Sequence, residues 1–145
     1  MNINTKTAKD ILLENGYTCV LCSDVAEYHS TLRGVKPLIE FLESGKDFNG
    51  FCAADKTVGA GAAHLYVLLG VKSVWANIIS QAGKKVLEQN GIEMFCENIV
   101  PFIINRSGDG ICPIETAVKD ITCSKQALET IKETLKKLIN KGCGN

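Results

Sequence analysis

The sequence lacks an excess of charge of either sign. Its 16 lysine and arginine residues balance its 16 aspartate and glutamate residues, so the formal net charge at pH 7 is zero. Proteins that bind nucleic acids or anionic membranes broadly do so through a basic surface. The composition therefore gives no reason to expect broad nucleic-acid binding or attachment to a membrane.

The sequence also lacks long apolar runs, linkers and low-complexity segments. No apolar run approaches the roughly 20 residues of a membrane-spanning helix. The first ten residues, MNINTKTAKD, do not have the charged and then apolar layout of a secretory signal. With 145 residues, 46% of them hydrophobic, we expect a single globular domain over residues 1–145, located in the cytoplasm.

Cysteine, in contrast, is frequent for a chain of this length. The seven cysteines are an odd number, and in a reducing cytoplasm they act mainly as small apolar residues. We expect this role for Cys52, Cys96 and Cys123. Cys19 and Cys22 form a Cys-x-x-Cys pair, but they lie in a stretch that resembles a strand, where residues three apart point to opposite faces. A redox or metal role for this pair is therefore disfavoured.

Residues 51–69 predict the centre of the fold, a buried strand followed by a buried helix. The strand is expected over residues 51–54, where a short apolar run ends at the charged pair Asp55 and Lys56. This pair is expected to form a polar corner. Because the strand is apolar on both faces, we expect it in the interior of a sheet.

The central helix is expected over about residues 57–69. It is apolar nearly all round, which is typical of a helix packed on several sides. Its first turns, residues 59–63, carry almost no side chain, so a backbone or a ligand can approach closely there. His64, in the middle of this apolar helix, is interpreted as a satisfied core residue rather than a ligand.

Hydrophobic spacing and turn residues predict the other elements. Helices are expected at 5–15, from 37 to near 45, at 81–90, at a short segment from 113 and at 124–141. Strands are expected at 17–23, 26–30, 72–79 and 92–96, with a further extended segment at 101–104. Strands that alternate with helices require right-handed crossovers, so we predict an α/β fold with a mixed five-stranded sheet and helices on both faces.

Three short motifs carry a resemblance to a known family. They are LRGVKPLIEFL at 32–42, DKTVG at 55–59 and ICPIE at 111–115. With the order of the expected elements, they resemble domain of unknown function family 1893, an uncharacterised family of the cytidine-deaminase-like fold. The resemblance covers roughly residues 1–120. It implies a three-layer α/β/α sandwich, with a core at about 1–104, a pocket-covering segment at 105–120 and a C-terminal helix at 124–141.

The chain departs from true deaminases at the metal site. In those enzymes a His-or-Cys-x-Glu motif starts one helix and a Pro-Cys-x-x-Cys motif starts the next, and together they supply the zinc ligands and a proton shuttle. The corresponding helix starts here read GVKP and DKTVG. Because neither offers a set of zinc ligands, we predict no metal, no other cofactor and no zinc-dependent deamination.

Two helix N-termini are expected to converge at the rebuilt pocket and to direct N–H donors into it. Lys36, Asp55 and Lys56 lie at its corners, and Gly59 lies at the start of the central helix. One interpretation is a site for a small polar or anionic molecule, nucleoside-like by analogy of fold, with Asp55 orienting it or exchanging a proton. In the other, Asp55 only caps the central helix and both lysines face solvent.

A second cluster runs from Asn105 and Arg106 to Glu115. Cys112, at a helix start, would have its thiolate favoured by the helix dipole and by Arg106, with Glu115 as a general acid or base beside it. Asn105 and Arg106 would then contact the bound molecule. Alternatively, Cys112 is a buried cap residue and Glu115 completes a capping box.

These residues are compatible with two functions. The first is an enzyme, or a degenerate relative of one, that binds a small polar metabolite without zinc. The second is a non-catalytic binding or regulatory module, present as a homodimer. The second cluster is also expected to cross over the small-residue start of the central helix. That crossing would place Arg106, Cys112 or Glu115 within contact reach of Asp55 or Lys56.

Overall fold

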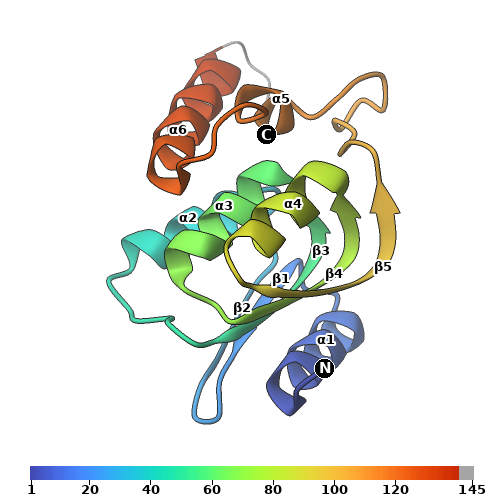
Figure 1. Cartoon of the computed structure of the whole chain (residues 1–145), viewed down its shortest axis with the longest axis vertical. Helices are drawn as coiled ribbons and strands as arrows, with labels where there is room; N and C mark the ends of the chain where they lie inside the picture. Colours follow the sequence, from blue (N-terminus) through green and yellow to red (C-terminus); the bar gives the residue numbers. More distant parts are fainter. Residues whose placement is uncertain (141–145) are drawn as a thin grey trace.

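Five strands form one mixed sheet in the computed structural model, which describes residues 1–140 (Figure 1). In chain order the strands are β1 (Cys19–Cys22), β2 (Glu27–Ser30), β3 (Cys52–Val58), β4 (Ser73–Ser80) and β5 (Glu93–Val100). They lie in the order β2-β1-β3-β4-β5. β1 is antiparallel to both β2 and β3, whereas β3, β4 and β5 are parallel. The mixed sheet with β3 in its interior is therefore confirmed.

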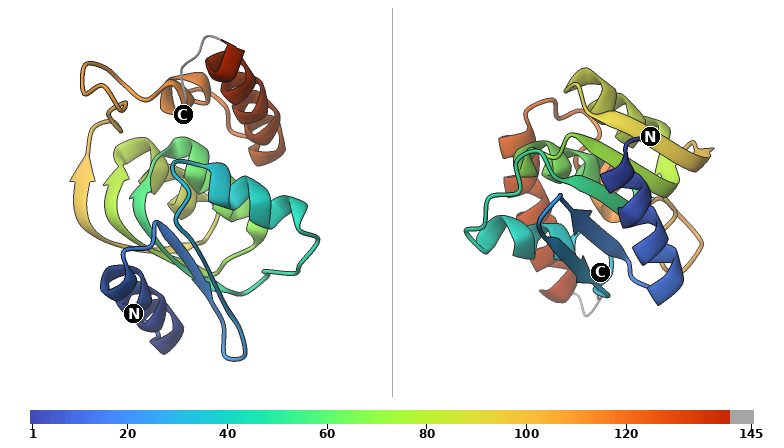
Figure 2. Two further views of the ribbon diagram at one scale, coloured as in Figure 1. Left: turned by 180° about the vertical axis from the view of Figure 1, so that it is seen from behind. Right: turned by 90° about the horizontal axis from the view of Figure 1, so that it is seen from below.

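Helices cover both faces of this sheet. In chain order they are α1 (Ile3–Asn15), α2 (Lys36–Glu43), α3 (Ala60–Leu69), α4 (Gln81–Gln89), α5 (Pro113–Ala117) and α6 (Ser124–Asn140). α1 lies on one face, and α2, α3 and α4 lie on the other (Figure 2). α5 and α6 pack outside α3 and add to the α/β/α sandwich. The C-terminal helix expected over 124–141 is present to Asn140, and residue 141 lies outside the described residues.

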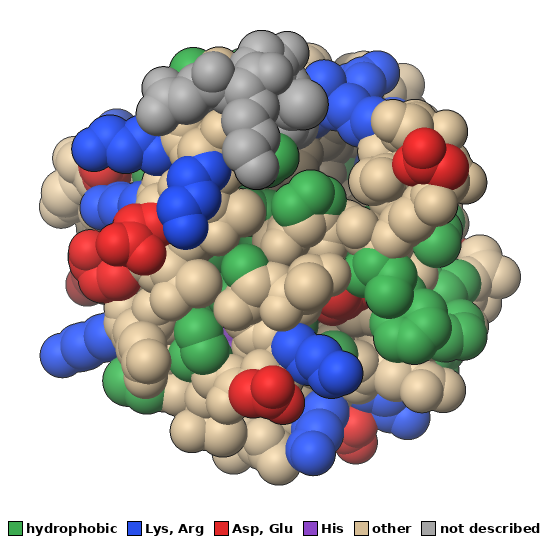
Figure 3. Space-filling view, turned by 90° about the horizontal axis from the view of Figure 1, so that it is seen from above, with side chains coloured by type: hydrophobic (Ala, Val, Ile, Leu, Met, Phe, Trp, Pro, Cys, Tyr) green, Lys and Arg blue, Asp and Glu red, His purple; other side chains and the backbone are tan. Residues whose placement is uncertain are grey.

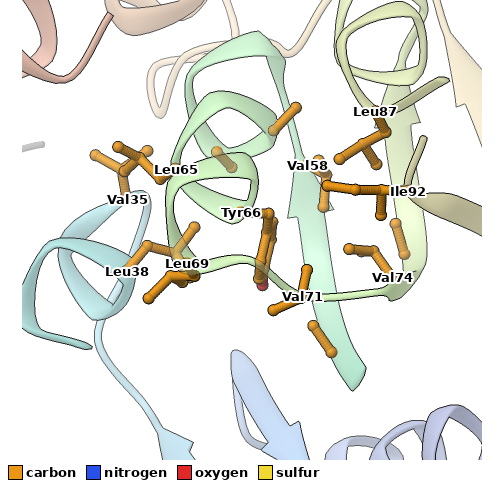
Figure 4. Packing of buried hydrophobic residues seen from close by; sticks show 14 of the residues in the cluster. Val35, Leu38, Val58, Leu65, Tyr66, Leu69, Val71, Val74, Leu87 and Ile92 are labelled. Atoms are coloured by element: carbon orange, nitrogen blue, oxygen red, sulfur yellow. The ribbon is translucent and has the colours of Figure 1, made fainter. Parts of the chain in front are cut away.

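The sheet separates two hydrophobic cores. The larger lies between the sheet and α2–α4, where side chains of α2 face those of α3 (Figure 4). The smaller lies under α1 and includes Leu12, Val20 and Trp75. Cys19 belongs to the larger core and Cys22 to the smaller, so the two thiols point to opposite faces, as predicted.

The largest difference from the predicted boundaries is at the end of β3. Asp55 pairs with Cys19 of β1 and with Ala76 of β4, so the strand continues past residue 54. The polar corner predicted at Asp55 and Lys56 is therefore wrong, because both residues lie within the strand. α3 begins later than predicted, after an extended N-cap residue.

Two other boundaries also moved. α1 begins at Ile3 and not at residue 5, because the Asn2 side chain caps the helix and accepts the Thr5 N–H at 2.9 Å. The segment 101–104 is not a strand, since its one β-bridge joins Ile104 to Ile111. None of the described helices has the length and hydrophobicity needed to cross a membrane.

Candidate functional site

Glu115 joins three parts of the chain that are distant in sequence. Its side chain is buried, with 6% of the residue exposed. Oε1 accepts hydrogen bonds from the Ala60 N–H at 2.7 Å and the Ser80 hydroxyl at 2.9 Å. Oε2 accepts one from the Ile103 N–H at 2.7 Å. The carboxylate thus lies at the N-termini of α3 and α4, where negative charge is favoured, and holds the loop after β5 against them.

The small residues at the start of α3 allow this close approach. A Cβ atom on Gly59 would lie 3.0 Å from the Ile103 side chain and 3.1 Å from Glu115 Oε1. A Cβ atom on Gly61 would overlap the side chain of Ile114. The predicted meeting of the central helix with the segment that ends at Glu115 is therefore confirmed, and this segment fills the space above α3. The predicted contact of Asp55 or Lys56 with Arg106, Cys112 or Glu115 stays a prediction.

Two alternative interpretations from the sequence are wrong. Asp55 does not cap α3, because the N-cap residue is Gly59 and the Ala60 N–H is bound by Glu115. Glu115 does not form a capping box with Cys112, because the Cys112 N–H donates to the Ile103 carbonyl at 2.8 Å. In both cases a partner distant in sequence replaces the local one.

Asp55 belongs to a separate buried group with Tyr66 and Cys19. The Tyr66 hydroxyl donates to Oδ2 at 2.7 Å and the Thr57 N–H donates to Oδ1 at 3.1 Å. The Cys19 thiol lies 3.3 Å from the Tyr66 hydroxyl. Burial raises the pKa of Asp55 to about 7, although the hydrogen bonds from Tyr66 and from backbone N–H groups act to lower it. Burial also raises the pKa of Tyr66 and of Cys19.

The remaining predicted site residues lie on different elements of the fold. Lys36 begins α2 and Lys56 lies on β3, both with exposed side chains. Asn105 and Arg106 lie in the turn that precedes α5. Cys112 is half-buried and packs against the larger core. The binding and catalytic roles of these residues stay predictions.

A groove of about 260 Å³ lies between α3, α4 and the connection from α5 to α6. Its polar lining consists of His64, Lys85, Gln89, Asn90, Lys119, Asp120 and Thr122. Ala60, Ala82, Val86, Val118 and Ile121 provide its apolar lining. Sequence reasoning missed this groove because its residues come from three separate segments and follow no motif.

His64 fixes one wall of the groove. Its Nδ1 lies 2.9 Å from the Ser124 hydroxyl and its Nε2 lies 3.1 Å from the Ile121 carbonyl oxygen. Because a carbonyl only accepts, we assign the proton to Nε2, and Nδ1 then accepts from Ser124. Burial lowers the pKa of His64, which favours the neutral ring. The interpretation of His64 as a satisfied core residue is confirmed.

The cysteines only partly follow the prediction that they behave as small apolar residues. Cys52 is buried and Cys96 is half-buried, but Cys123 is exposed immediately before α6. Hydrogen bonds from the backbone N–H groups of Gln126 and Lys125 lower the pKa of its thiol. Within residues 1–140, no three His, Cys, Asp or Glu side chains are grouped so that they could hold a metal ion.

The arrangement of strands and helices defines the class of protein. A hairpin precedes the parallel strands, the strand order is β2-β1-β3-β4-β5, and helices cover both faces. This is an α/β protein of cytidine-deaminase-like fold, and the starts of α2 and α3 lack the zinc motifs of deaminases. A family model described as Domain of unknown function (DUF1893) matches residues 7–135, and the chain belongs to this family. No curated protein matches the chain.

Three solved structures are similar to the chain to different degrees. A DUF1893 family protein from Thermotoga maritima is 23% identical, with a TM-score of 0.82 over 94% of this chain and 92% of its own. A dCMP deaminase from the cyanophage S-TIM5 is 16% identical, with a TM-score of 0.44 over 67% of this chain and 94% of its own. A diaminohydroxyphosphoribosylaminopyrimidine deaminase/5-amino-6-(5-phosphoribosylamino)uracil reductase from Thermotoga maritima is 15% identical, with a TM-score of 0.44 over 65% of this chain and 35% of its own. The first of these likenesses establishes the fold.

The hydrogen bonds of Glu115 predict a loss of stability on Glu115→Gln. The amide nitrogen of glutamine cannot accept, so at least one of the donors loses its partner. Since a hydrogen bond to a charged group contributes about 1.5–3 kcal/mol, we expect the free energy of unfolding to fall by roughly 2 kcal/mol or more. Urea unfolding followed by circular dichroism measures this. The exposed Glu129→Gln on α6 is the control, and equal losses in the two variants would contradict the prediction.

The pKa of Asp55, about 7, predicts that stability falls as pH rises. Between its usual pKa near 3.8 and about 7, the folded state retains a proton that the unfolded state has lost, so acid favours folding. From about pH 5 to about pH 8, we expect Asp55 to cost roughly 3 kcal/mol of unfolding free energy. Asp55→Asn should remove this slope from urea titrations, whereas the exposed Asp47→Asn should retain it. A wild-type slope that survives in Asp55→Asn would refute the assignment.

Proposed function

We propose that the chain is a non-catalytic binding module that takes up a small polar or anionic molecule in the groove between α3, α4 and the α5–α6 connection. The observation that carries this proposal is the combination of polar side chains and an apolar floor in one concave space. Ligand sites are mostly apolar hollows with a few convergent polar groups. The volume of about 260 Å³ is close to the lower end of their range, roughly 300–1,000 Å³, which suits a small metabolite.

The charges of the groove favour an anion. Lys85 and Lys119 line it, and Asp120 is the one acidic side chain among its lining residues. His64 adds no charge, because burial lowers its pKa and both ring nitrogens are hydrogen-bonded. Gln89 supplies an amide that both donates and accepts, so it can contact a polar group beside the charge. A small molecule with one negative group therefore fits the lining.

The junction at Glu115 is less suited to a ligand. The region between the starts of α3 and α4 is occupied by the Glu115 carboxylate and by the side chains of Ile103 and Ile114. A ligand at this place would have to displace three hydrogen bonds to a buried carboxylate. The groove lies next to this junction, since Ala60 contributes to both. A nucleoside-like ligand is suggested by analogy of fold alone.

Catalysis by Cys112, Glu115 and Asp55 is the competing proposal. A general acid or base must be within reach of the proton that it transfers. The oxygens of Glu115 are engaged by backbone and hydroxyl donors, and those of Asp55 by Tyr66 and Thr57. These contacts support the binding module over the enzyme.

The proposed site predicts which lysines affect binding. Native mass spectrometry of protein purified from its own host tests for a bound molecule, and inorganic phosphate serves as a defined probe. A double variant with Lys85→Ala and Lys119→Ala should weaken phosphate binding about tenfold or more, because each charge-assisted hydrogen bond contributes about 1.5 kcal/mol. NMR chemical shifts during a phosphate titration measure the affinity.

The matched control for the groove is a double variant with Lys136→Ala and Lys137→Ala on the exposed face of α6. It removes the same charge from the protein but leaves the groove intact. Equal affinities in the two double variants, or shifts confined to residues outside the groove, would refute the site.

Thiol reactivity separates the two functions. At about pH 7, iodoacetamide should modify Cys123 faster than Cys112, because the thiolate is the nucleophile and backbone N–H groups lower the pKa of the exposed Cys123. Peptide mapping gives the rate at each cysteine. Cys123→Ser should remove the modification at that position and leave the rate at Cys112 unchanged. Faster modification of Cys112 than of Cys123 would favour the enzyme.

A further inference from the structure

β5 forms a long open edge of the sheet. It pairs in parallel with β4 from Glu93 to Val100, and within residues 1–140 no strand pairs with its other side. The opposite edge is the four-residue β2. An unpaired edge of eight residues presents N–H and C=O groups that another strand can bind.

The β5 edge lacks the usual features that prevent such pairing. Proteins protect open edges with lysine, proline or a bulge. β5 contains neither lysine nor proline, and its register with β4 keeps a constant offset, so it has no bulge. Its charged residues are Glu93 and Glu97, and Glu97 is 3.6 Å from Lys9 of α1. The edge can therefore pair with a strand that places no acidic residue opposite Glu93 or Glu97.

An apolar patch continues from the end of this edge. Ile99 is 47% exposed, Phe102 52%, Ile104 56% and Ile111 41%. Ile104 and Ile111 are held side by side by a β-bridge. Figure 3 shows hydrophobic side chains gathered at the side of the molecule where β5 and the following loop lie. Such a group next to an unpaired strand is typical of a protein interface.

We infer that this surface binds a second copy of the chain, with the two β5 strands antiparallel about a two-fold axis. The two sheets would then form one continuous sheet, and the apolar patches would cover each other. An isologous contact needs a surface that is complementary to itself, and an uncharged apolar patch beside a free strand edge meets this condition. This surface shares no residue with the proposed groove, so a failure of one proposal does not affect the other.

The charges restrict the register of the paired strands. Phe95 packs in the core under α1 and Cys96 against the core on the opposite face, so odd-numbered residues of β5 face α1. An axis through Glu97 would place the two copies of Glu97 opposite each other, and an axis through Phe95 would oppose Glu93 to Glu97. Like charges directly opposite destabilise a strand pair. An axis at Ile99 avoids both and brings the two Ile99 side chains together.

Sedimentation equilibrium of the full chain tests this inference. We expect a mass twice the 15.7 kDa of one chain. Ile99→Lys should raise the dissociation constant about 100-fold or more, because two lysine charges would meet near the axis. Val25→Lys is the matched control, since Val25 is 94% exposed in the turn between β1 and β2, at the opposite edge of the sheet, and this variant should remain dimeric.

Hydrogen exchange of the unmodified protein is the second measurement, and it does not depend on the folding of a variant. Amides of β5 that point away from β4 should exchange more slowly at a high protein concentration than at a low one. A monomeric wild-type protein would overturn the inference. The β5 edge would then be a candidate site for a strand of another protein. A dimer that Ile99→Lys leaves intact, with no concentration-dependent protection in β5, would also overturn it, because its interface would lie elsewhere.

Discussion

The buried carboxylate of Glu115 is the interaction that holds the layer formed by α5 and α6 on α3. Burial of a charge is costly unless hydrogen bonds compensate it, and here each oxygen is bound. The same contact satisfies the first N–H of α3, which has no side-chain cap of its own. It therefore fixes α5 on α3, and α6 follows, covering the outer side of α3 through Ala127 and Ile131.

His64 holds the same layer at a second point. Its ring binds the chain at Ile121 and Ser124, so the connection between α5 and α6 is attached to the middle of α3. The groove lies between these two attachments, and its shape depends on both. Neither attachment uses an exposed charge, which makes the layer insensitive to salt compared with a surface ion pair.

Much of the fold could be predicted because its signals are local. The all-apolar character of 51–54 and the small residues after 58 mark an interior strand and a close-packed helix. The end of β3 could not be predicted, because a charged residue inside a strand normally indicates a corner, and the partner of Asp55 is Tyr66 on the next helix. Glu115 was selected as a site residue, but its role depends on Ala60, 55 positions away. The groove could not be predicted, because its lining residues come from three segments that meet only in the folded chain.

The late position of Glu115 in the sequence has a consequence for the order of events during synthesis. The whole sheet is encoded by residue 100, but the contacts that cover α3 come from residues 103–131. During synthesis the N-terminal part of the chain leaves the ribosome first. A nascent chain that has just completed β5 therefore carries an exposed apolar helix with an unbound N-terminus. In this interval the outer side of α3 is exposed apolar surface that can make non-native contacts.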